Sequence, residues 1–201
     1  MSFRRAAALI TACAALAGFL WLAVQVSHDA TVHFDAAVRA SVHSHASPAV
    51  TSFMRRITMY GSEWFLVPFG GLLCLWFVKR GRPKDAVRLA VASLGAEVLN
   101  QVLKLLYHRI RPEAFFDYAQ PSSFSFPSGH AIVSACFYGM LAMILAARLQ
   151  GFAARALIVF AAAALVITIG ISRVYLGVHH PTDVLAGYLM AVVWISLIRA
   201  Y

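Results

Sequence analysis

Six long apolar runs restrict the fold of this chain more than any other feature. A helix needs about 20 mostly apolar residues to cross the hydrocarbon core of a bilayer, which is about 30 Å thick. The runs cover residues 6–26, 64–78, 86–107, 130–147, 154–171 and 182–198. Hydrophobic residues make up 61% of the chain and charged residues only 12%, a composition outside the usual range of soluble proteins. We therefore predict an all-α integral membrane protein with six transmembrane helices and a single domain, residues 1–201.

The first run follows Arg4 and Arg5, a pattern that also begins secretory signal peptides. Its apolar part is longer than the usual signal-peptide core of about 7 to 15 residues, and no small-residue cleavage site follows it. We expect a membrane helix that is not cleaved.

Residues 28–58 are more polar, but their apolar residues recur at helical spacing. We expect one or two amphipathic helices at the membrane surface, broken near Pro48; an ordinary polar connection is the alternative. Four histidines also fall in this segment: His28, His33, His43 and His45. Their spacing fits no common metal site, and Cys13, Cys74 and Cys136 lie singly in apolar segments. We therefore predict no metal site and no disulfide.

Basic residues outnumber acidic ones by 17 to 8 and cluster between the apolar runs. This placement favours membrane topology over nucleic-acid binding. With the N-terminus in the cytoplasm, ten of the 17 basic residues fall inside: Arg4, Arg5, Lys79, Arg80, Arg82, Lys84, Arg88, Arg148, Arg155 and Arg199. Six crossings then place the C-terminus inside as well.

Three polar segments share the outer face in this topology: KLLYHRIRP at 104–112, PSGH at 127–130 and SRVYLGVHHPTD at 172–183. Together they contain Lys104, Arg111 and Arg173, whose positive charges match a phosphoryl group. A cation costs about 2.5 to 3.5 kcal/mol at the bilayer centre and less near the interface, so a purely structural role would be expensive. Phosphate is the expected ligand.

Ser128 and Gly129 directly precede the fourth run, at the start of an expected helix. We expect both backbone amides to point outward and form an anion cradle, with the Ser128 hydroxyl as a further donor. The PSGH sequence alone is a weak signal, because Pro-Ser-Gly is also common in loops.

His130 and His179 supply two imidazoles, which are what phosphoryl transfer needs for an attacking group and a proton donor. Asp183 lies four residues after His179 and can hold a histidine N–H, which fixes the tautomer. Each residue also has a structural explanation, since Pro181 and Asp183 make a good helix start.

The motifs resemble those of the type-2 phosphatidic acid phosphatases, relatives of bacterial acid phosphatases and vanadium haloperoxidases. The matching pattern is Lys, six residues, Arg-Pro; then Pro-Ser-Gly-His; then Ser-Arg, five residues, His, three residues, Asp. It occupies residues 104–183 of this chain. Three motifs in order are highly specific, and the six-helix layout extends the resemblance over nearly the whole chain.

The resemblance implies a phosphatase that needs no metal or other cofactor. His179 would attack phosphorus to give a phosphohistidine, Asp183 would orient His179, and His130 would protonate the leaving group and later activate water. The remaining residues of the pattern would bind the phosphoryl oxygens: Lys104, Arg111, Ser128, Gly129 and Arg173.

Three further residues lie near the motifs, and the pattern assigns them no catalytic role. Glu97 shares a face of the third membrane helix with Lys104, so it is expected to offset buried positive charge or to line the cavity, with packing against another helix as the alternative. His108, together with Arg109, is placed by proximity alone to contact the lipid headgroup. His180 matches no catalytic position and is expected to be a helix-start neighbour near the site.

The expected activity is hydrolysis of a membrane lipid phosphate at the outer face of the cytoplasmic membrane of a bacterium. Candidate substrates are undecaprenyl diphosphate, phosphatidic acid and phosphatidylglycerol phosphate, and the compact chain favours the first only by analogy. A haloperoxidase and an anion- or lipid-phosphate-binding transporter without hydrolysis are the alternatives. The sequence predicts no oligomeric state.

Overall fold

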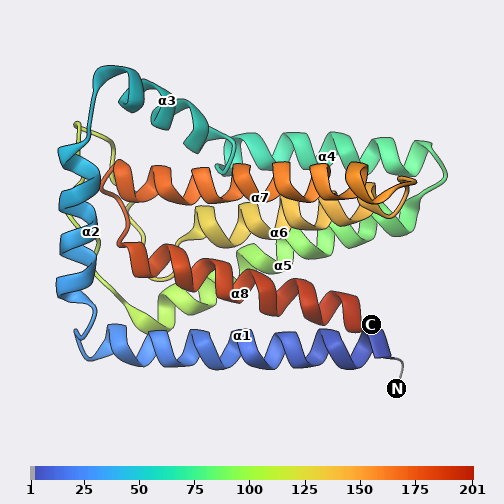
Figure 1. The fold of residues 1–201 in the computed structure, drawn as a ribbon, viewed down its shortest axis with the longest axis horizontal. Coiled ribbons are helices and arrows are strands. Elements are labelled where there is room, and N and C mark those ends of the chain that lie inside the picture. Colours follow the sequence, from blue (N-terminus) through green and yellow to red (C-terminus); the bar gives the residue numbers. More distant parts are fainter. Residues whose placement is uncertain (1–2) are drawn as a thin grey trace.

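The computed structural model describes residues 3–201, and these fold into eight α-helices without a strand (Figure 1). The helices are α1 (Phe3–Ser27), α2 (Val32–Ser44), α3 (Pro48–Met59), α4 (Glu63–Lys79), α5 (Pro83–Tyr107), α6 (Gly129–Ala146), α7 (Phe152–Tyr175) and α8 (Pro181–Ala200). The predicted all-α membrane fold is confirmed, and each apolar run coincides with a helix to within one or a few residues.

The second membrane crossing differs from the prediction. Five helices, α1, α5, α6, α7 and α8, are each long and apolar enough to span a membrane. Helix α4 has only 17 residues and falls short of about 20. Helices α3 and α4 meet the same criterion together, as a pair bent by 46°. The sixth candidate span is therefore this bent pair and not residues 64–78 alone.

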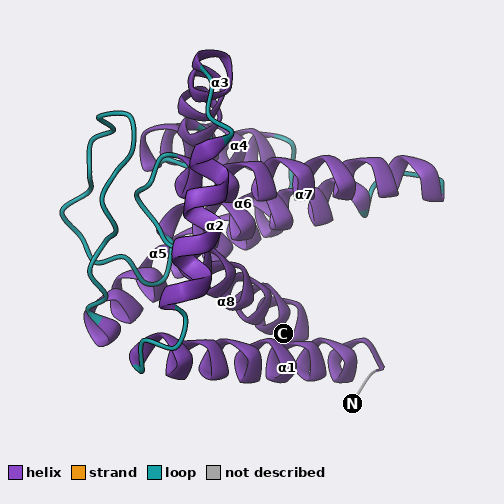
Figure 2. Cartoon of the chain, turned by 60° about the vertical axis from the view of Figure 1, so that its left-hand side comes forward, coloured by secondary structure: helices purple, strands orange, loops and turns teal. Residues whose placement is uncertain are grey.

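The polar segment after α1 forms two helices with a break at Pro48, as predicted. The Ser47 hydroxyl caps α3 by accepting a hydrogen bond from the Val50 N–H at 3.3 Å, and Pro48 occupies the first helical turn, where a missing N–H costs nothing. Helix α2 runs across the ends of the other helices, which is the direction expected of a surface helix (Figures 1 and 2).

Helix α6 lies at the centre of the bundle and contacts α5, α7 and α8, while α1 packs along α8. Gly187 allows α8 to approach the start of α6 closely. A Cβ atom at Gly187 would lie 2.8 Å from the Ala131 Cβ and 2.9 Å from the Ser128 carbonyl oxygen. This close packing fixes the start of α6 against the start of α8, where two of the predicted motifs lie.

The two ends of the bundle differ in their composition. The start of α1 and the end of α8 lie at one end, together with the α4–α5 and α6–α7 connections (Figure 1). There the Asp85 carboxylate accepts hydrogen bonds from Arg82 at 2.8 Å and Arg148 at 2.9 Å. Helix α2, the loop of residues 108–128 and the α7–α8 connection lie at the opposite end (Figures 1 and 2).

Candidate active site

A pocket of about 640 Å³ lies toward the α2 end of the bundle, and the three predicted motifs meet in it. Seven of the predicted site residues line it: Glu97, Lys104, Arg111, Gly129, His130, Arg173 and His179. They come from α5, the 108–128 loop, α6, α7 and the α7–α8 connection. Residues far apart in the sequence are therefore brought to one cavity.

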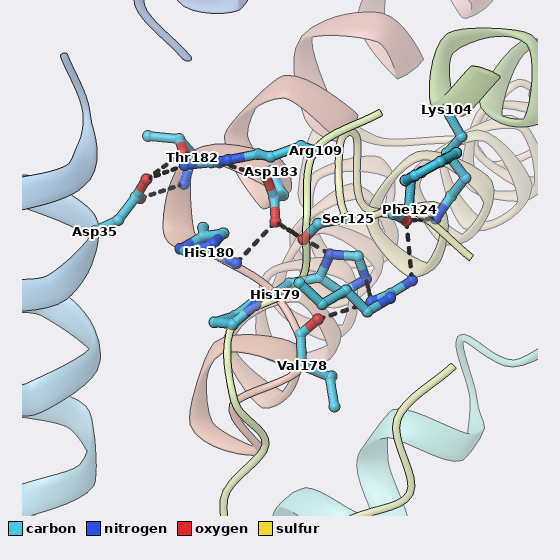
Figure 3. Close-up of polar contacts among 12 residues, drawn as sticks. Asp35, Lys104, Arg109, Phe124, Ser125, Val178, His179, His180, Thr182 and Asp183 are labelled. Atoms are coloured by element: carbon cyan, nitrogen blue, oxygen red, sulfur yellow. Dashed lines mark hydrogen bonds and ion pairs between the residues drawn. The ribbon is translucent and has the colours of Figure 1, made fainter. Parts of the chain in front are cut away.

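His179 is buried between a carboxylate and a guanidinium group (Figure 3). Its Nδ1 lies 3.3 Å from Asp183 Oδ2, and its Nε2 lies 3.0 Å from Arg111 Nη1. Because a guanidinium only donates hydrogen bonds, Nε2 must be the acceptor and Nδ1 must carry the proton. Burial, opposed in part by Asp183, lowers the pKa of His179 to about 3, so the ring is neutral. A neutral imidazole with Nε2 unprotonated has the form of a nucleophile.

The three predicted cations reach the pocket from three segments. Arg111 is held by the Ser123 carbonyl oxygen at 2.7 Å and the Val178 carbonyl oxygen at 2.7 Å. Burial, with the nearby charge of Arg173, lowers the pKa of Arg111 to about 10, so it remains charged at neutral pH. Arg173 is almost fully buried and donates to the Thr58 hydroxyl at 2.7 Å.

Lys104 is also buried, and its ammonium group donates to the Ser123 hydroxyl at 3.2 Å and to the Phe124 carbonyl oxygen. Ser123 and Phe124 also accept hydrogen bonds from Arg111. The loop therefore holds two cations side by side, an arrangement that only an anion can stabilise further.

The start of α6 differs in part from the expected anion cradle. The Ser128 N–H donates to the Asp183 carbonyl oxygen at 2.9 Å, so the expectation that this amide points outward is wrong. The reason is the close contact of α6 with α8 at Gly187. The Ser128 hydroxyl is buried and has no partner within residues 3–201. Gly129 does line the pocket, and a Cβ there would lie 2.9 Å from Asn100 Nδ2.

His130 lies in the first turn of α6 and lines the same pocket as His179. Gly61, in the turn between α3 and α4, lies against its ring: a Cβ at Gly61 would be 3.2 Å from His130 Cδ2. The two imidazoles therefore face one cavity from separate helix ends.

Sequence reasoning missed the residues behind Asp183 (Figure 3). Asp183 Oδ1 accepts from Arg109 at 2.6 Å, and Oδ2 accepts from the Ser125 hydroxyl at 2.5 Å. Arg109 also donates to Asp35 of α2 at 2.8 Å. The expectation that Arg109 contacts a lipid headgroup is therefore wrong, because both ends of its guanidinium bind carboxylates. No local sequence signal connects Asp35, in the polar segment after α1, to the site.

Among the described residues, His108 and His180 both lie outside the lining of the pocket. His108 is exposed at the end of α5, and its ring packs edge-on against Phe124 with 4.6 Å between centroids. It is absent from the pocket lining among the described residues, which does not support a contact with the headgroup. His180 is the N-cap of α8, and its backbone N–H donates to Asp183 Oδ2 at 2.8 Å. Burial lowers the pKa of His180.

Glu97 lines the pocket and accepts a hydrogen bond from Gln101 at 2.5 Å. Asn100, one turn from Lys104, lines it as well, and its Oδ1 is buried without a partner in the described part of the chain. From these residues the lining continues along α4 and α5: Trp64, Leu66, Val67, Gly70, Gly71, Leu89, Ala90 and Leu94. The polar site thus opens into an apolar groove between two helices.

Replacing His179 with glutamine is expected to reduce the destabilising effect of acid. In the unfolded chain this histidine takes up a proton near its ordinary pKa of 6.5, whereas the folded protein resists protonation until about pH 3. The unfolded state therefore binds more protons between these values, and stability falls as the pH drops through this window. At a pH near 5, the low pKa of His179 reduces the free energy of unfolding by about 2 kcal/mol relative to neutral pH. Thermal melting in detergent at neutral pH and near pH 5 measures it, and an equal fall in Tm for both proteins would contradict the burial of a neutral ring.

Comparison with known proteins gives consistent matches. The profile of the PAP2 superfamily matches residues 85–201. Phosphatidylglycerophosphatase B of Bacillus subtilis is 32% identical, with 91% of this chain and 90% of that protein covered. An undecaprenyl-diphosphatase of Sulfolobus acidocaldarius is 27% identical, with 86% of this chain and 80% of that protein covered. The crystal structure of a transmembrane PAP2-type phosphatidylglycerolphosphate phosphatase from Bacillus subtilis superposes with a TM-score of 0.86, at 31% identity and with 94% of each chain covered.

Proposed function

The chain belongs to the PAP2 superfamily, and from this premise we propose that it is a membrane lipid phosphatase that acts through a phosphohistidine on His179. The observation that carries the proposal is the environment of His179. Its Nδ1 is directed at Asp183, and its Nε2 is directed at Arg111 in a pocket lined by two further cations.

The first step forms the phosphoenzyme. Arg111, Arg173 and Lys104 bind the phosphoryl oxygens, and Arg111 gives up its contact with His179 for the phosphate. The Nε2 lone pair then attacks phosphorus, and the bond from phosphorus to the lipid oxygen breaks with its electron pair on that oxygen. His130 in its imidazolium form protonates the departing oxygen, while Asp183 holds the Nδ1 proton and stabilises the positive charge that develops on His179.

The second step returns the enzyme to its starting state. His130, now neutral, takes a proton from a water molecule as the water oxygen attacks phosphorus. The P–N bond breaks, its electron pair returns to His179 Nε2, and inorganic phosphate leaves. The two steps consume one water molecule and need no electron transfer.

The groove between α4 and α5 supports a lipid substrate. Its walls are apolar along much of their length, and it begins beside the cations, so a lipid tail can remain in the bilayer while the phosphate reaches His179.

We place phosphatidylglycerol phosphate first among the candidate substrates. In the same pocket as the cations, the Glu97 carboxylate offers hydrogen-bond acceptors. Acceptors suit a glycerol hydroxyl better than the second phosphate of a diphosphate, which carries negative charge. The similarity to phosphatidylglycerophosphatase B points the same way. Undecaprenyl diphosphate and phosphatidic acid remain the comparison substrates.

The proposed topology places both termini in the cytoplasm and the active site on the outer face of the cytoplasmic membrane. The end of the bundle that carries the start of α1 and the end of α8 also carries Lys79, Arg80, Arg82 and Arg148 in or beside its connections. An excess of Lys and Arg is typical of cytoplasmic loops.

A substrate panel in detergent with excess EDTA tests the proposal. The purified protein is expected to release phosphate from phosphatidylglycerol phosphate faster than from undecaprenyl diphosphate or phosphatidic acid, and EDTA is expected to leave the rate unchanged. A preparation of His179→Ala controls for contaminating phosphatases. Tight binding of the lipid without phosphate release would instead support a transporter, and loss of activity in EDTA would contradict a metal-independent reaction.

A further inference from the structure

A chain of buried ionic contacts connects helix α2 with Asp183 and His179 (Figure 3). Arg109 lies between two carboxylates, at 2.8 Å from Asp35 Oδ2 and 2.6 Å from Asp183 Oδ1. Asp183 in turn contacts His179 Nδ1. We propose that Asp35 is a positioning residue for the Asp183–His179 pair and acts through Arg109, an inference that rests on the phosphatase function proposed above.

Asp35 is built into the start of α8. Its side chain is 2% exposed, and Oδ1 accepts the backbone N–H of Thr182 at 3.0 Å. Oδ2 accepts the Thr182 hydroxyl at 2.7 Å as well as the Arg109 guanidinium. A carboxylate from α2 therefore caps the positive end of α8 and fixes the residue next to Asp183.

Thr182 closes the network. Its hydroxyl oxygen accepts from Arg109 at 2.8 Å and donates its proton to Asp35. Arg109, Thr182 and Asp35 thus form a closed ring of hydrogen bonds, and Arg109 connects this ring to Asp183, which contacts His179. A change at Asp35 is transmitted to His179 by this route.

The charge of Asp35 matters as well as its position. Two buried carboxylates share the single positive charge of Arg109. Without the charge of Asp35, the guanidinium acts on Asp183 alone and competes with His179 for that carboxylate. Asp183 would then stabilise less well the positive charge that His179 gains during attack on phosphorus.

The position of Asp35 separates its effect on His179 from the binding of the substrate. Within residues 3–201, Gly61 is the first residue in the sequence that lines the pocket. Asp35 is therefore not part of the pocket wall. The side chains of Lys104, Arg111 and Arg173 donate hydrogen bonds to Ser123, Phe124, Val178 and Thr58, and not to Asp35. A change at Asp35 is therefore expected to act on the chemical step and to leave the binding of the phosphate group nearly unchanged.

The matched control is Asp85, at the opposite end of the bundle. It is also a buried carboxylate, 8% exposed, and accepts from two arginines, Arg82 and Arg148. Asp85→Asn removes the charge of a buried ion pair, as Asp35→Asn does, but without a connection to His179.

Steady-state kinetics on the lipid substrate in detergent test the inference, with thermal melting to confirm the fold. Asp35→Asn is expected to lower kcat by about 10- to 100-fold and to change KM by less than about twofold, and Asp35→Glu is expected to recover part of the rate. Asp85→Asn is expected to lower Tm but to keep the wild-type kcat. Thr182→Val, which removes the bridging hydroxyl, is expected to lower kcat in the same way, and it replaces Asp35→Asn if that variant does not fold.

Three results would overturn the inference: a wild-type kcat in Asp35→Asn, or in Thr182→Val when it replaces that variant; a higher KM with unchanged kcat; or an equal loss of kcat in Asp85→Asn. Each of these leaves the proposed function intact, because the wild-type protein is active in each. A wild-type protein that releases no phosphate from any lipid of the panel would overturn the proposed function and this inference together.

Discussion

Replacement of His179 with alanine is expected to lower phosphate release by at least about 10⁴-fold, because the change removes the group that forms the bond to phosphorus. The fold should survive. Asp183, the polar partner left behind, still accepts hydrogen bonds from Ser125, the His180 backbone and Arg109. The loss of stability is therefore expected to be about 2 kcal/mol. Phosphate release and thermal melting of the purified variant measure the two effects.

His45→Ala is the control for this substitution. His45 is exposed at the end of α2 and lies outside the pocket lining. Its removal is expected to leave the rate at the wild-type value. Near-normal turnover by His179→Ala in a preparation free of other phosphatases would show that a different group attacks phosphorus.

Replacement of His130 with alanine is expected to give a second large loss, about 10²- to 10⁴-fold on a lipid phosphate. An alkoxide is a poor leaving group, so this reaction depends on a proton from His130. An aryl phosphate leaves as a stable phenolate and needs less protonation, so the variant should lose much less activity on p-nitrophenyl phosphate. The ratio of the two rates, compared with wild type, measures the role of His130 as an acid.

One outcome would contradict the role of His130 as general acid. Equal losses on the two substrates would show that His130 does not act by protonating the leaving group, because activation of water in the second step, phosphate binding and support of the local fold are all independent of the leaving group. His130 lines the pocket next to Gly129 at the start of α6, so a role in binding has a structural basis and the comparison of substrates is needed.

The sequence predicted the membrane fold and the meeting of the three motifs because both depend on local patterns. Long apolar runs determine the spans, and the motifs lie at helix ends that topology brings to one face. Lys104 and His179 could be placed in one pocket by this argument alone. The structure places both residues in the wall of one pocket. Their chemical roles stay predictions.

Features that arise from tertiary packing could not be predicted in this way. The Ser128 amide bonds to Asp183 because Gly187 lets α8 approach α6, and spacing within one motif contains no information on that contact. Asp35 lies in a segment whose pattern indicates only an amphipathic helix. Its burial at the start of α8 depends on the position of α2 across the helix ends (Figure 1). The bend that joins α3 to α4 in the sixth candidate span could not be predicted either, because hydropathy does not show the angle between two helices.

The most direct test of the account is to trap the phosphoenzyme. The protein is mixed with lipid substrate that carries a radioactive terminal phosphate, quenched in alkali within the first turnover, and digested for peptide mapping. If His179 is the nucleophile, label that is stable to alkali and released by acid, as expected for a P–N bond, is found on His179 of the wild-type protein and is absent from His179→Ala. Full turnover with no label on His179, or with label on another residue, would contradict this role of His179.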